Sequence, residues 1–368
     1  MRLIYTDRSL PGIARVAQDG GFRYLSPRGR PLVGAQALKR VGELVIPPAW
    51  TNVWISANAA THIQATGIDA KGRLQYVYHP LFRQTQEAAK FSKLIKFAQV
   101  LPKLREAVAR DMALKGIPRE RALATLVYLL EATLIRIGND AYARENESFG
   151  LSTLSPDHVV VEGTSLTFEF TGKSAKKWQV TIRDRRAAAV MRACQELPGQ
   201  KLFKYLDEDG NLRSVSSSDV NAYLRAASGR RISAKDFRTW SGTLICAVAL
   251  AKEPPPPSKT QLKRQAMQAL REAAKALGNT PAVCRSSYVH PGLWDAHGSG
   301  ELHKLMTLAA RREAALGRLK PHEDALLRLL RRLERAARLA AGEATLVVAA
   351  PVAKGALKAA AESTAPAA

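Results

Sequence analysis

Five side chains in the middle and C-terminal parts of the chain suit phosphoryl transfer through a covalent phosphotyrosine. They are two arginines, a lysine, an asparagine and a tyrosine: Arg136, Arg238, Lys173, Asn279 and Tyr288. Arginines neutralise the non-bridging oxygens of a phosphate as charge accumulates on them. A lysine can protonate the departing oxygen while the tyrosine attacks phosphorus. An unperturbed tyrosine has a pKa of about 10, so the arginines must also favour its phenolate.

A phosphotyrosyl ester conserves the energy of the broken phosphodiester bond, so resealing that bond needs no ATP. This agrees with the sequence, which lacks the G-x-x-x-x-G-K-[ST] nucleotide loop. It also lacks an H-E-x-x-H segment and a paired C-x-x-C. Residues 207–211 (DEDGN) lack the later ligands of a calcium loop, and their Asp-Gly step favours a surface turn. We therefore expect neither a cofactor nor a metal.

Taken singly, most of these residues have an ordinary structural explanation. Arg136 is predicted in the last turn of a helix over residues 118–137, where it would offset the helix dipole. Lys173 is predicted at a hairpin tip, where lysines are commonly just solvated. Tyr288 follows the start of a short helix, and tyrosines in such places commonly pack. The combination of the five favours the phosphoryl-transfer chemistry.

Arg238 has the least ordinary position. It is predicted in the first turn of a helix over residues 234–252, which begins with a capping box of Ser233 and Asp236. A helix N-terminus is already positive and disfavours a cation. It does suit a phosphate, which the unpaired helix amides and the guanidinium can grip together.

The elements that must position these residues indicate an α+β protein with a small β-rich N-terminal domain (residues 1–90) and a larger, mostly helical domain (residues 91–305). Strands alternate with turns in the first domain, around one helix within residues 34–44. Helical spacing covers residues 84–99, 102–115, 118–137, 183–196, 217–227, 234–252 and 259–277. Three antiparallel strands are predicted over residues 158–182. Residues 306–368 are predicted to form a basic helical extension and an Ala-rich, disordered tail.

The charge points to a polyanionic partner. The chain has 56 Lys and Arg against 32 Asp and Glu, a formal net charge of +24. Such a protein often binds nucleic acid through steering and counterion release. The alternatives are a merely basic soluble protein or, less favoured, an anionic membrane surface. No run approaches the ~20 apolar residues of a membrane span, and no secretory signal is evident. We expect a cytoplasmic protein.

Several motifs resemble type IB DNA topoisomerases of the small bacterial and poxviral kind, over residues 4–305. Residues 46–55 (IPPAWTNVWI) and 62–76 (HIQATGIDAKGRLQY) are similar to the family's N-terminal DNA-clamp domain. Four further motifs resemble the family's catalytic domain in their order and spacing. They are Arg136 with ENESFGL at residues 145–151 after it, Lys173 in a Thr-Gly-Lys turn, KDFRT around Arg238, and Tyr288 nine residues after Asn279.

The resemblance implies a monomer that closes as a clamp around duplex DNA. Tyr288 would attack one strand, forming a 3′-phosphotyrosyl link and releasing a 5′-hydroxyl. Lys173, assisted by Arg136, would protonate the leaving oxygen, while Arg136 and Arg238 hold the phosphate. Strand rotation and resealing would relax positive and negative supercoils without ATP or an obligatory metal. Asn279 stands where viral and eukaryotic members usually have histidine, so it can donate a hydrogen bond but not carry a charge.

The N-terminal domain is expected to supply most DNA contacts outside the reaction centre. Tyr76 and Tyr78 share one face of a strand, which would meet a DNA groove with Lys71 and Arg73 on phosphates. In the alternative, the two tyrosines fill the small domain's core. The expected DNA contacts are Lys71, Arg73, Gln75, Tyr76, Tyr78 and Tyr142.

Two other functions fit parts of the pattern. Tyrosine recombinases share the arginine, lysine and tyrosine set, but they usually have histidine where this chain has Lys235, and a helical N-terminal domain. A basic architectural protein with a coincidental catalytic set would bind DNA without changing its linking number. The basic helices near the C-terminus lie largely beyond the resemblance, so truncation after Leu305 is expected to weaken DNA binding at high salt and to spare cleavage.

Overall fold

The computed structural model describes residues 3–315 and 317–341. The chain divides into two compact units, and the division falls inside helix α2 (Pro80–Met112), between Lys90 and Phe91. The second unit extends to Ala337. Most of the predicted Ala-rich tail, from residue 342 onward, lies outside the described residues. In the part that the structure describes, no helix is long and apolar enough to cross a membrane.

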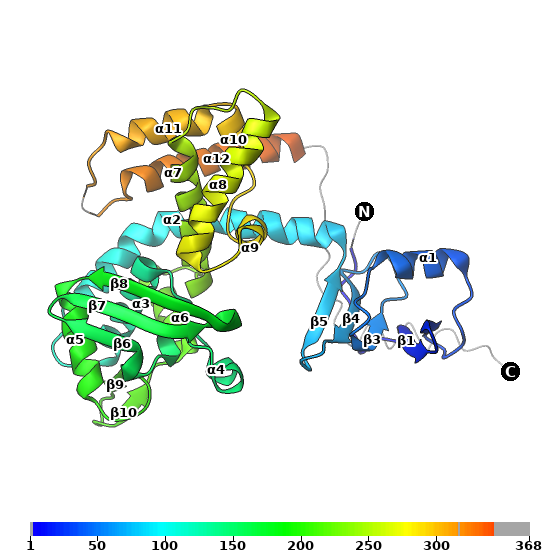
Figure 1. The fold of residues 1–368 in the computed structure, drawn as a ribbon, viewed down its shortest axis with the longest axis horizontal. Helices are drawn as coiled ribbons and strands as arrows, with labels where there is room; N and C mark the ends of the chain where they lie inside the picture. Colours follow the sequence, from blue (N-terminus) through cyan, green and yellow to red (C-terminus); the bar gives the residue numbers. More distant parts are fainter. Residues whose placement is uncertain (1–2, 316, 342–368) are drawn as a thin grey trace. The chain divides into compact units, whose positions relative to one another are not determined.

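The first unit is built on a five-stranded antiparallel sheet with the order β2-β1-β3-β4-β5 (Figure 1). Its strands are β1 (Ile13–Gln18), β2 (Gly21–Leu25), β3 (Thr51–Ile55), β4 (Ile63–Ile68) and β5 (Leu74–Tyr78), and its helix is α1 (Ala35–Glu43). A small core of Ile13, Val41, Val53, Ile55 and Ala65 joins the sheet to α1. The β-rich N-terminal region predicted from the sequence is confirmed.

Strand β4 does not show the hydrophobic alternation that identifies a half-buried strand, and the sequence prediction missed it. Two of its side chains, Gln64 and Thr66, are polar and yet buried. Gln64 accepts a hydrogen bond from Arg40 Nη2 (2.8 Å) and donates to the Thr61 carbonyl oxygen (2.6 Å). These hydrogen bonds offset the cost of removing the Gln64 amide from water.

The second unit is mostly helical, as predicted, and holds a three-stranded antiparallel sheet in the order β6-β7-β8 (Figure 1). The strands are β6 (Val159–Glu162), β7 (Ser165–Gly172) and β8 (Lys176–Arg183), with a small hairpin of β9 (Lys204–Leu206) and β10 (Leu212–Ser214). The helices after α2 are α3 (Arg119–Thr133), α4 (Asp140–Asn146), α5 (Arg185–Glu196), α6 (Ser217–Ser228), α7 (Ala234–Ala251), α8 (Lys259–Leu277), α9 (Pro281–Ser287), α10 (Leu293–Gly298), α11 (Glu301–Ala310) and α12 (Pro321–Ala341).

Helix α2 runs through Pro102, where the sequence predicted a break between two helices. An internal proline removes one helical hydrogen bond and costs about 3 kcal/mol. The side chains on either side of it, Leu101 and Leu104, are each 1% exposed and belong to the core of the second unit. Their burial, at about 1.5–3 kcal/mol each, holds the helix together across the proline.

Helix α12 is part of the core of the second unit, although residues 306–368 were expected to form a basic helical extension and a tail. Leu326, Leu329 and Leu330 are at most 1% exposed and lie in the same hydrophobic cluster as α2 and α3. Arg105 of α2 also bridges Glu131 of α3 and Glu323 of α12, with Nη2 2.7 Å from Glu323 Oε1. Burial opposes ionisation of Glu323, but the hydrogen bond and charge of Arg105 lower the pKa of this carboxyl.

Truncation after Leu305 is therefore expected to unfold the second unit rather than to spare its chemistry. A point variant isolates the effect. Leu326→Ala should lower the free energy of unfolding by about 2–5 kcal/mol, the usual cost of emptying a leucine site in a core. Leu339→Ala removes a leucine that is 75% exposed on the same helix and should change it by less than about 0.5 kcal/mol. Urea unfolding of both variants, followed by circular dichroism, tests this, and equal stabilities would refute it.

Candidate active site

A cavity of about 450 Å³ in the second unit is lined by four of the five residues singled out in the sequence. These are Arg136, Lys173, Arg238 and Tyr288. They come from four separate segments that the fold brings together: the loop after α3, the β7–β8 turn, helix α7 and the end of α9. The fifth, Asn279, does not line the cavity but is hydrogen-bonded to Arg136, which does.

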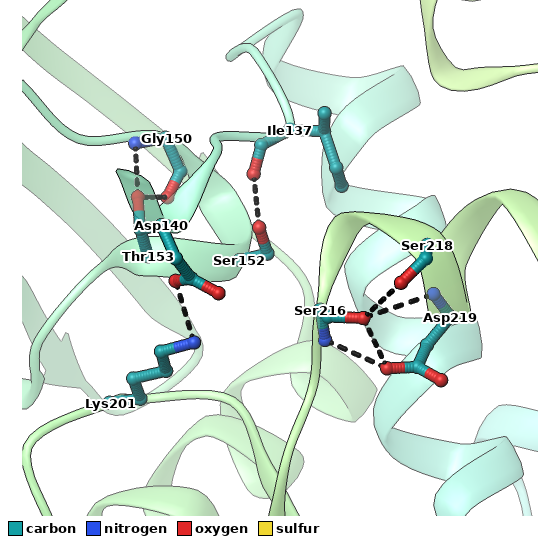
Figure 2. A network of polar contacts seen from close by, with 9 residues as sticks. All are labelled: Ile137, Asp140, Gly150, Ser152, Thr153, Lys201, Ser216, Ser218 and Asp219. Carbon is teal, nitrogen blue, oxygen red and sulfur yellow. Dashed lines mark hydrogen bonds and ion pairs between the residues drawn. The ribbon is translucent and has the colours of Figure 1, made fainter. Parts of the chain in front are cut away.

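Arg136 lies in a loop. The prediction that it lies in the last turn of a helix is wrong. Helix α3 ends at Thr133 because Leu134 adopts a left-handed conformation (φ 57°). The loop is then held by residues 150–153. The amide of Leu151 donates to the Arg136 carbonyl (2.8 Å), and both the amide and the hydroxyl of Ser152 donate to the Ile137 carbonyl (2.7 Å each), the latter shown in Figure 2. Arg136 is thus fixed by its backbone.

Tight backbone packing supports this arrangement one residue further along. Gly138 has φ 95°, and a Cβ there would lie 2.8 Å from Thr153 Oγ1. That hydroxyl accepts a hydrogen bond from the amide of Gly150 (3.0 Å; Figure 2). Glycine is required at position 138 because other residues are strained at this φ and would collide with the threonine.

Arg238, in the second turn of α7, is buried, at 4% exposed, and its guanidinium binds backbone carbonyls from two other helix ends. Nη1 donates to the carbonyl of Leu134, the C-cap of α3, and Nη2 to the carbonyl of Leu277, the last residue of α8, at 2.6 Å. Two negative helix C-termini therefore stabilise the cation. Burial lowers the pKa of Arg238, and the positive charge of Arg136 lowers it further.

Tyr288 is the C-cap of α9 and lies close to α7. A Cβ on Gly242 would be 3.1 Å from the Tyr288 Cβ, and the Thr243 hydroxyl donates to the Tyr288 carbonyl (3.0 Å). The Arg238 guanidinium carbon is 5.3 Å from the centre of the Tyr288 ring. Burial opposes ionisation of the phenol, but the positive charges of Arg238 and Arg136 prevail and lower the pKa of Tyr288. This is the direction that a nucleophilic phenol requires.

Asn279 directly follows Gly278, the C-cap of α8, and is hydrogen-bonded to Arg136. Its Oδ1 accepts a hydrogen bond from Arg136 Nη2 at 2.5 Å. Its Nδ2 is buried and has no hydrogen-bond partner among the described residues, and the same holds for Nε of Arg238. Unsatisfied buried donors are uncommon and call for an explanation. An anion bound beside them would supply the missing acceptor.

Lys173 stands in the short turn that joins β7 and β8 and lines the cavity. The turn is tight, since Ser174 and Ala175 both have positive φ, 64° and 56°. The Lys173 side chain is exposed, so its position depends on how the hairpin beneath it is held. The hairpin itself was predicted from the sequence.

The cavity lining also contains residues that the sequence did not single out. Lys235, at the start of α7, faces the cavity and contributes to lowering the pKa of Tyr288. Ser148 and Phe149 lie on its wall. The sequence partly indicated that these residues belong to the site, because they fall in the KDFRT and ENESFGL segments that resemble the family's motifs. Among the described residues, no group of three or more His, Cys, Asp or Glu side chains can hold a metal ion.

The expected DNA contacts of the first unit lie on an exposed surface. Tyr76 and Tyr78 are 44% and 36% exposed and stack on each other, with ring centroids 5.6 Å apart. The alternative that they fill the core is therefore wrong. The side chain of Tyr142, in α4, lies outside the described part of the chain.

The carboxylate of Asp69 organises the turn before β5, a role that was not predicted from the sequence. Its carboxylate accepts hydrogen bonds from the Lys71 amide (3.0 Å), from Arg73 Nε and Nη2 (2.9 and 2.7 Å) and from Gln75 Nε2 (2.9 Å). The hydrogen bonds from Arg73 hold the pKa of Asp69 well below its usual range. Two expected DNA contacts, Arg73 and Gln75, are thus tied to one carboxylate.

Comparison with known proteins covers both units. The family model for the catalytic core of eukaryotic DNA topoisomerase I matches residues 79–294, and that for the N-terminal domain of bacterial DNA topoisomerase IB matches residues 21–69. DNA topoisomerase 1B of Acanthamoeba polyphaga mimivirus is 33% identical over 287 residues, 76% of this chain and 85% of that protein. DNA topoisomerase 1B of vaccinia virus (strain Copenhagen) is 22% identical over 238 residues, 63% and 71% of the two chains. All five candidate residues lie within the match to the catalytic core.

Proposed function

Because the chain belongs to the type IB DNA topoisomerases, we propose that it relaxes both positive and negative supercoils by cutting and resealing one DNA strand, with Tyr288 as the nucleophile. The observation that carries the proposal is the convergence of Arg136, Lys173, Arg238 and Tyr288 on one cavity. The cavity is cationic, and its tyrosine has a lowered pKa. Both features suit attack on a phosphodiester.

In the proposed reaction the Tyr288 Oη forms a bond to phosphorus as the bond between phosphorus and the 5′ oxygen breaks. The phenolic proton is lost to solvent, a loss that the charges of Arg238 and Arg136 favour. The 5′ oxygen leaves as a hydroxyl after taking a proton from Lys173, and the 3′ end stays on Tyr288. Resealing is the same step in reverse, so no ATP enters.

The arginines and Asn279 would hold the phosphate. Arg136 keeps its fork oriented by its bond to Asn279 Oδ1, which leaves Asn279 Nδ2 to donate to a non-bridging oxygen. Arg238 contributes its Nε in the same way, since this buried N–H has no partner among the described residues, whereas Nη1 and Nη2 each donate one hydrogen bond to a backbone carbonyl. Each preorganised donor of this kind is worth roughly 10²–10³ in rate.

Under this proposal the protein acts as a monomer whose two units close around duplex DNA, and it works on the nucleoid. Tyr76 and Tyr78 would meet a groove, and Lys71, Arg73 and Gln75 the neighbouring phosphates and bases. The exposed, stacked pair of tyrosines supports this assignment. Tyr142 is retained as a further proposed contact.

Asp69→Asn tests the first unit's surface. Loss of the carboxylate should loosen Arg73 and Gln75 without weakening overall binding, because a negative charge beside the DNA is also lost. We expect the preference among cleavage sites mapped on an end-labelled DNA fragment to relax by about tenfold, the scale of one oriented side-chain contact to a base. Asp19→Asn, in the turn between β1 and β2, removes the same charge and should leave the cleavage pattern unchanged. An unaltered pattern for both variants would rule out an ordering role for Asp69.

Relaxation of plasmid DNA tests the function as a whole. The protein should relax positively and negatively supercoiled plasmid in EDTA without ATP, as a monomer by light scattering. A tyrosine recombinase would instead need paired sites and form tetramers. Binding without any change of linking number after deproteinisation would leave only the architectural alternative.

A further inference from the structure

Trp178 of β8 occupies an unusual place in the second unit, between two segments that carry candidate catalytic residues. It is 8% exposed, and its ring lies parallel to that of Phe170, with centroids 6.1 Å apart and an interplanar angle of 2°. The Phe170 contact ties the indole to strand β7, its partner in the hairpin. The indole thus packs against the side chain of its cross-strand neighbour.

Two glycines press against this indole, and each directly precedes a candidate catalytic residue. A Cβ on Gly172, before Lys173, would lie 2.8 Å from Cδ1 and Nε1 of Trp178. A Cβ on Gly278, before Asn279, would lie 2.3 Å from Cζ2. Real Cβ atoms do not approach so closely, so only glycine lets both backbones lie against the ring. One contact is with the five-membered ring and the other with the six-membered ring.

The residues on either side of Gly278 are hydrogen-bonded to the two arginines of the site. Leu277 precedes it, and the Leu277 carbonyl accepts the hydrogen bond from Arg238 Nη2. Asn279 follows it and binds Arg136. The indole thus sets the hairpin that carries Lys173 against the helix end that anchors both arginines. The Lys173 side chain is exposed, so its placement depends on this packing beneath the turn.

We propose that Trp178 is a positioning residue that holds Lys173 in register with the phosphate-binding arginines. The proposal rests on the proposed function, in which Lys173 Nζ gives its proton to the departing 5′ oxygen. A lysine displaced by even 1 Å protonates poorly, because proton transfer needs heavy atoms about 2.6–3.2 Å apart. Loss of the indole should therefore impair protonation of the leaving group in particular.

The experiment compares two duplexes that carry a cleavage site mapped beforehand with the wild-type protein. One has the normal 5′ bridging oxygen, and the other has sulfur in its place. A thiol has a pKa of about 8.5, so a thiolate departs without a proton donor. Single-turnover formation of the covalent adduct is measured for wild type, Lys173→Ala, Trp178→Phe and Gly172→Ala, with Phe168→Leu as control. Phe168 is buried on β7, the strand that precedes Lys173.

Trp178→Phe should slow cleavage of the oxygen duplex by at least tenfold more than Phe168→Leu does, and cleavage of the sulfur duplex by less than threefold. Gly172→Ala, which pushes a methyl group into the indole, should show the same selective rescue if Trp178→Phe fails to fold. Equal slowing on both duplexes, or slowing no greater than that of Phe168→Leu, would overturn the positioning role. If wild type forms no adduct, or Lys173→Ala is not rescued by sulfur, the proposed function or its acid fails instead.

Discussion

Tyr288→Phe is expected to bind supercoiled DNA as wild type does, to form no covalent adduct and to leave the linking number unchanged. The substitution removes only the phenolic oxygen, which would form the bond to phosphorus. The ring is partly buried against the core of the second unit, so phenylalanine should keep the fold. Loss of a nucleophile with no substitute typically reduces the rate by more than about 10⁴-fold. Adduct formation is read as protein that remains attached to DNA after denaturation.

Tyr205→Phe provides the matched control, because it removes a hydroxyl from a partly buried tyrosine of β9 outside the cavity. This variant should relax plasmid at the wild-type rate. If Tyr288→Phe still relaxed plasmid, the family assignment would stand but another nucleophile would have to be sought. If both variants lost activity, the loss would reflect folding, and their thermal unfolding would show it.

The sequence was most informative where chemistry and local pattern coincide. The hairpin with Lys173 at its tip, the capping box before Arg238 and the cap before Pro281 are each signalled by residues adjacent in sequence, and the structure contains all three. The α+β fold and the β-rich first unit were predicted correctly. The roles of the five site residues stay a prediction, since the structure shows only that they converge.

What the sequence could not indicate depends on contacts between distant segments. The break in α3 at Leu134 lies in an apolar run, and the left-handed turn makes sense only once the Leu134 carbonyl meets Arg238, 104 residues later. The continuity of α2 through Pro102 and the burial of α12 likewise depend on tertiary packing that outweighs local preference. Asp69 in the turn before β5 looked like an ordinary turn residue because its partners are defined only by side-chain geometry.

Replacement of Arg238 is expected to affect both stability and catalysis. In Arg238→Ala the carbonyls of Leu134 and Leu277 lose their buried donor, at a cost of about 1–3 kcal/mol each in unfolding free energy. One phosphate-binding donor disappears as well, which should slow cleavage by roughly 10²–10³-fold. Arg121→Ala is the control for the structural part, since Arg121 donates to the carbonyls of Met112, the last residue of α2, and of Gly116 in the loop that follows, outside the cavity. It should lose stability and keep its cleavage rate.

The pH dependence of cleavage separates the two contributions of Arg238. Its charge lowers the pKa of Tyr288, so in Arg238→Ala that pKa rises back toward or above the usual value of about 10. The cleavage rate grows with pH as long as the phenol is still protonated, and the variant should keep rising at pH values where wild type has levelled off. Its defect should thus be smaller at high pH than at neutral pH. A defect of constant size at every pH would show that Arg238 binds the phosphate without activating the nucleophile. A similar change in the pH dependence of cleavage by Arg121→Ala would show that the change comes from altered stability.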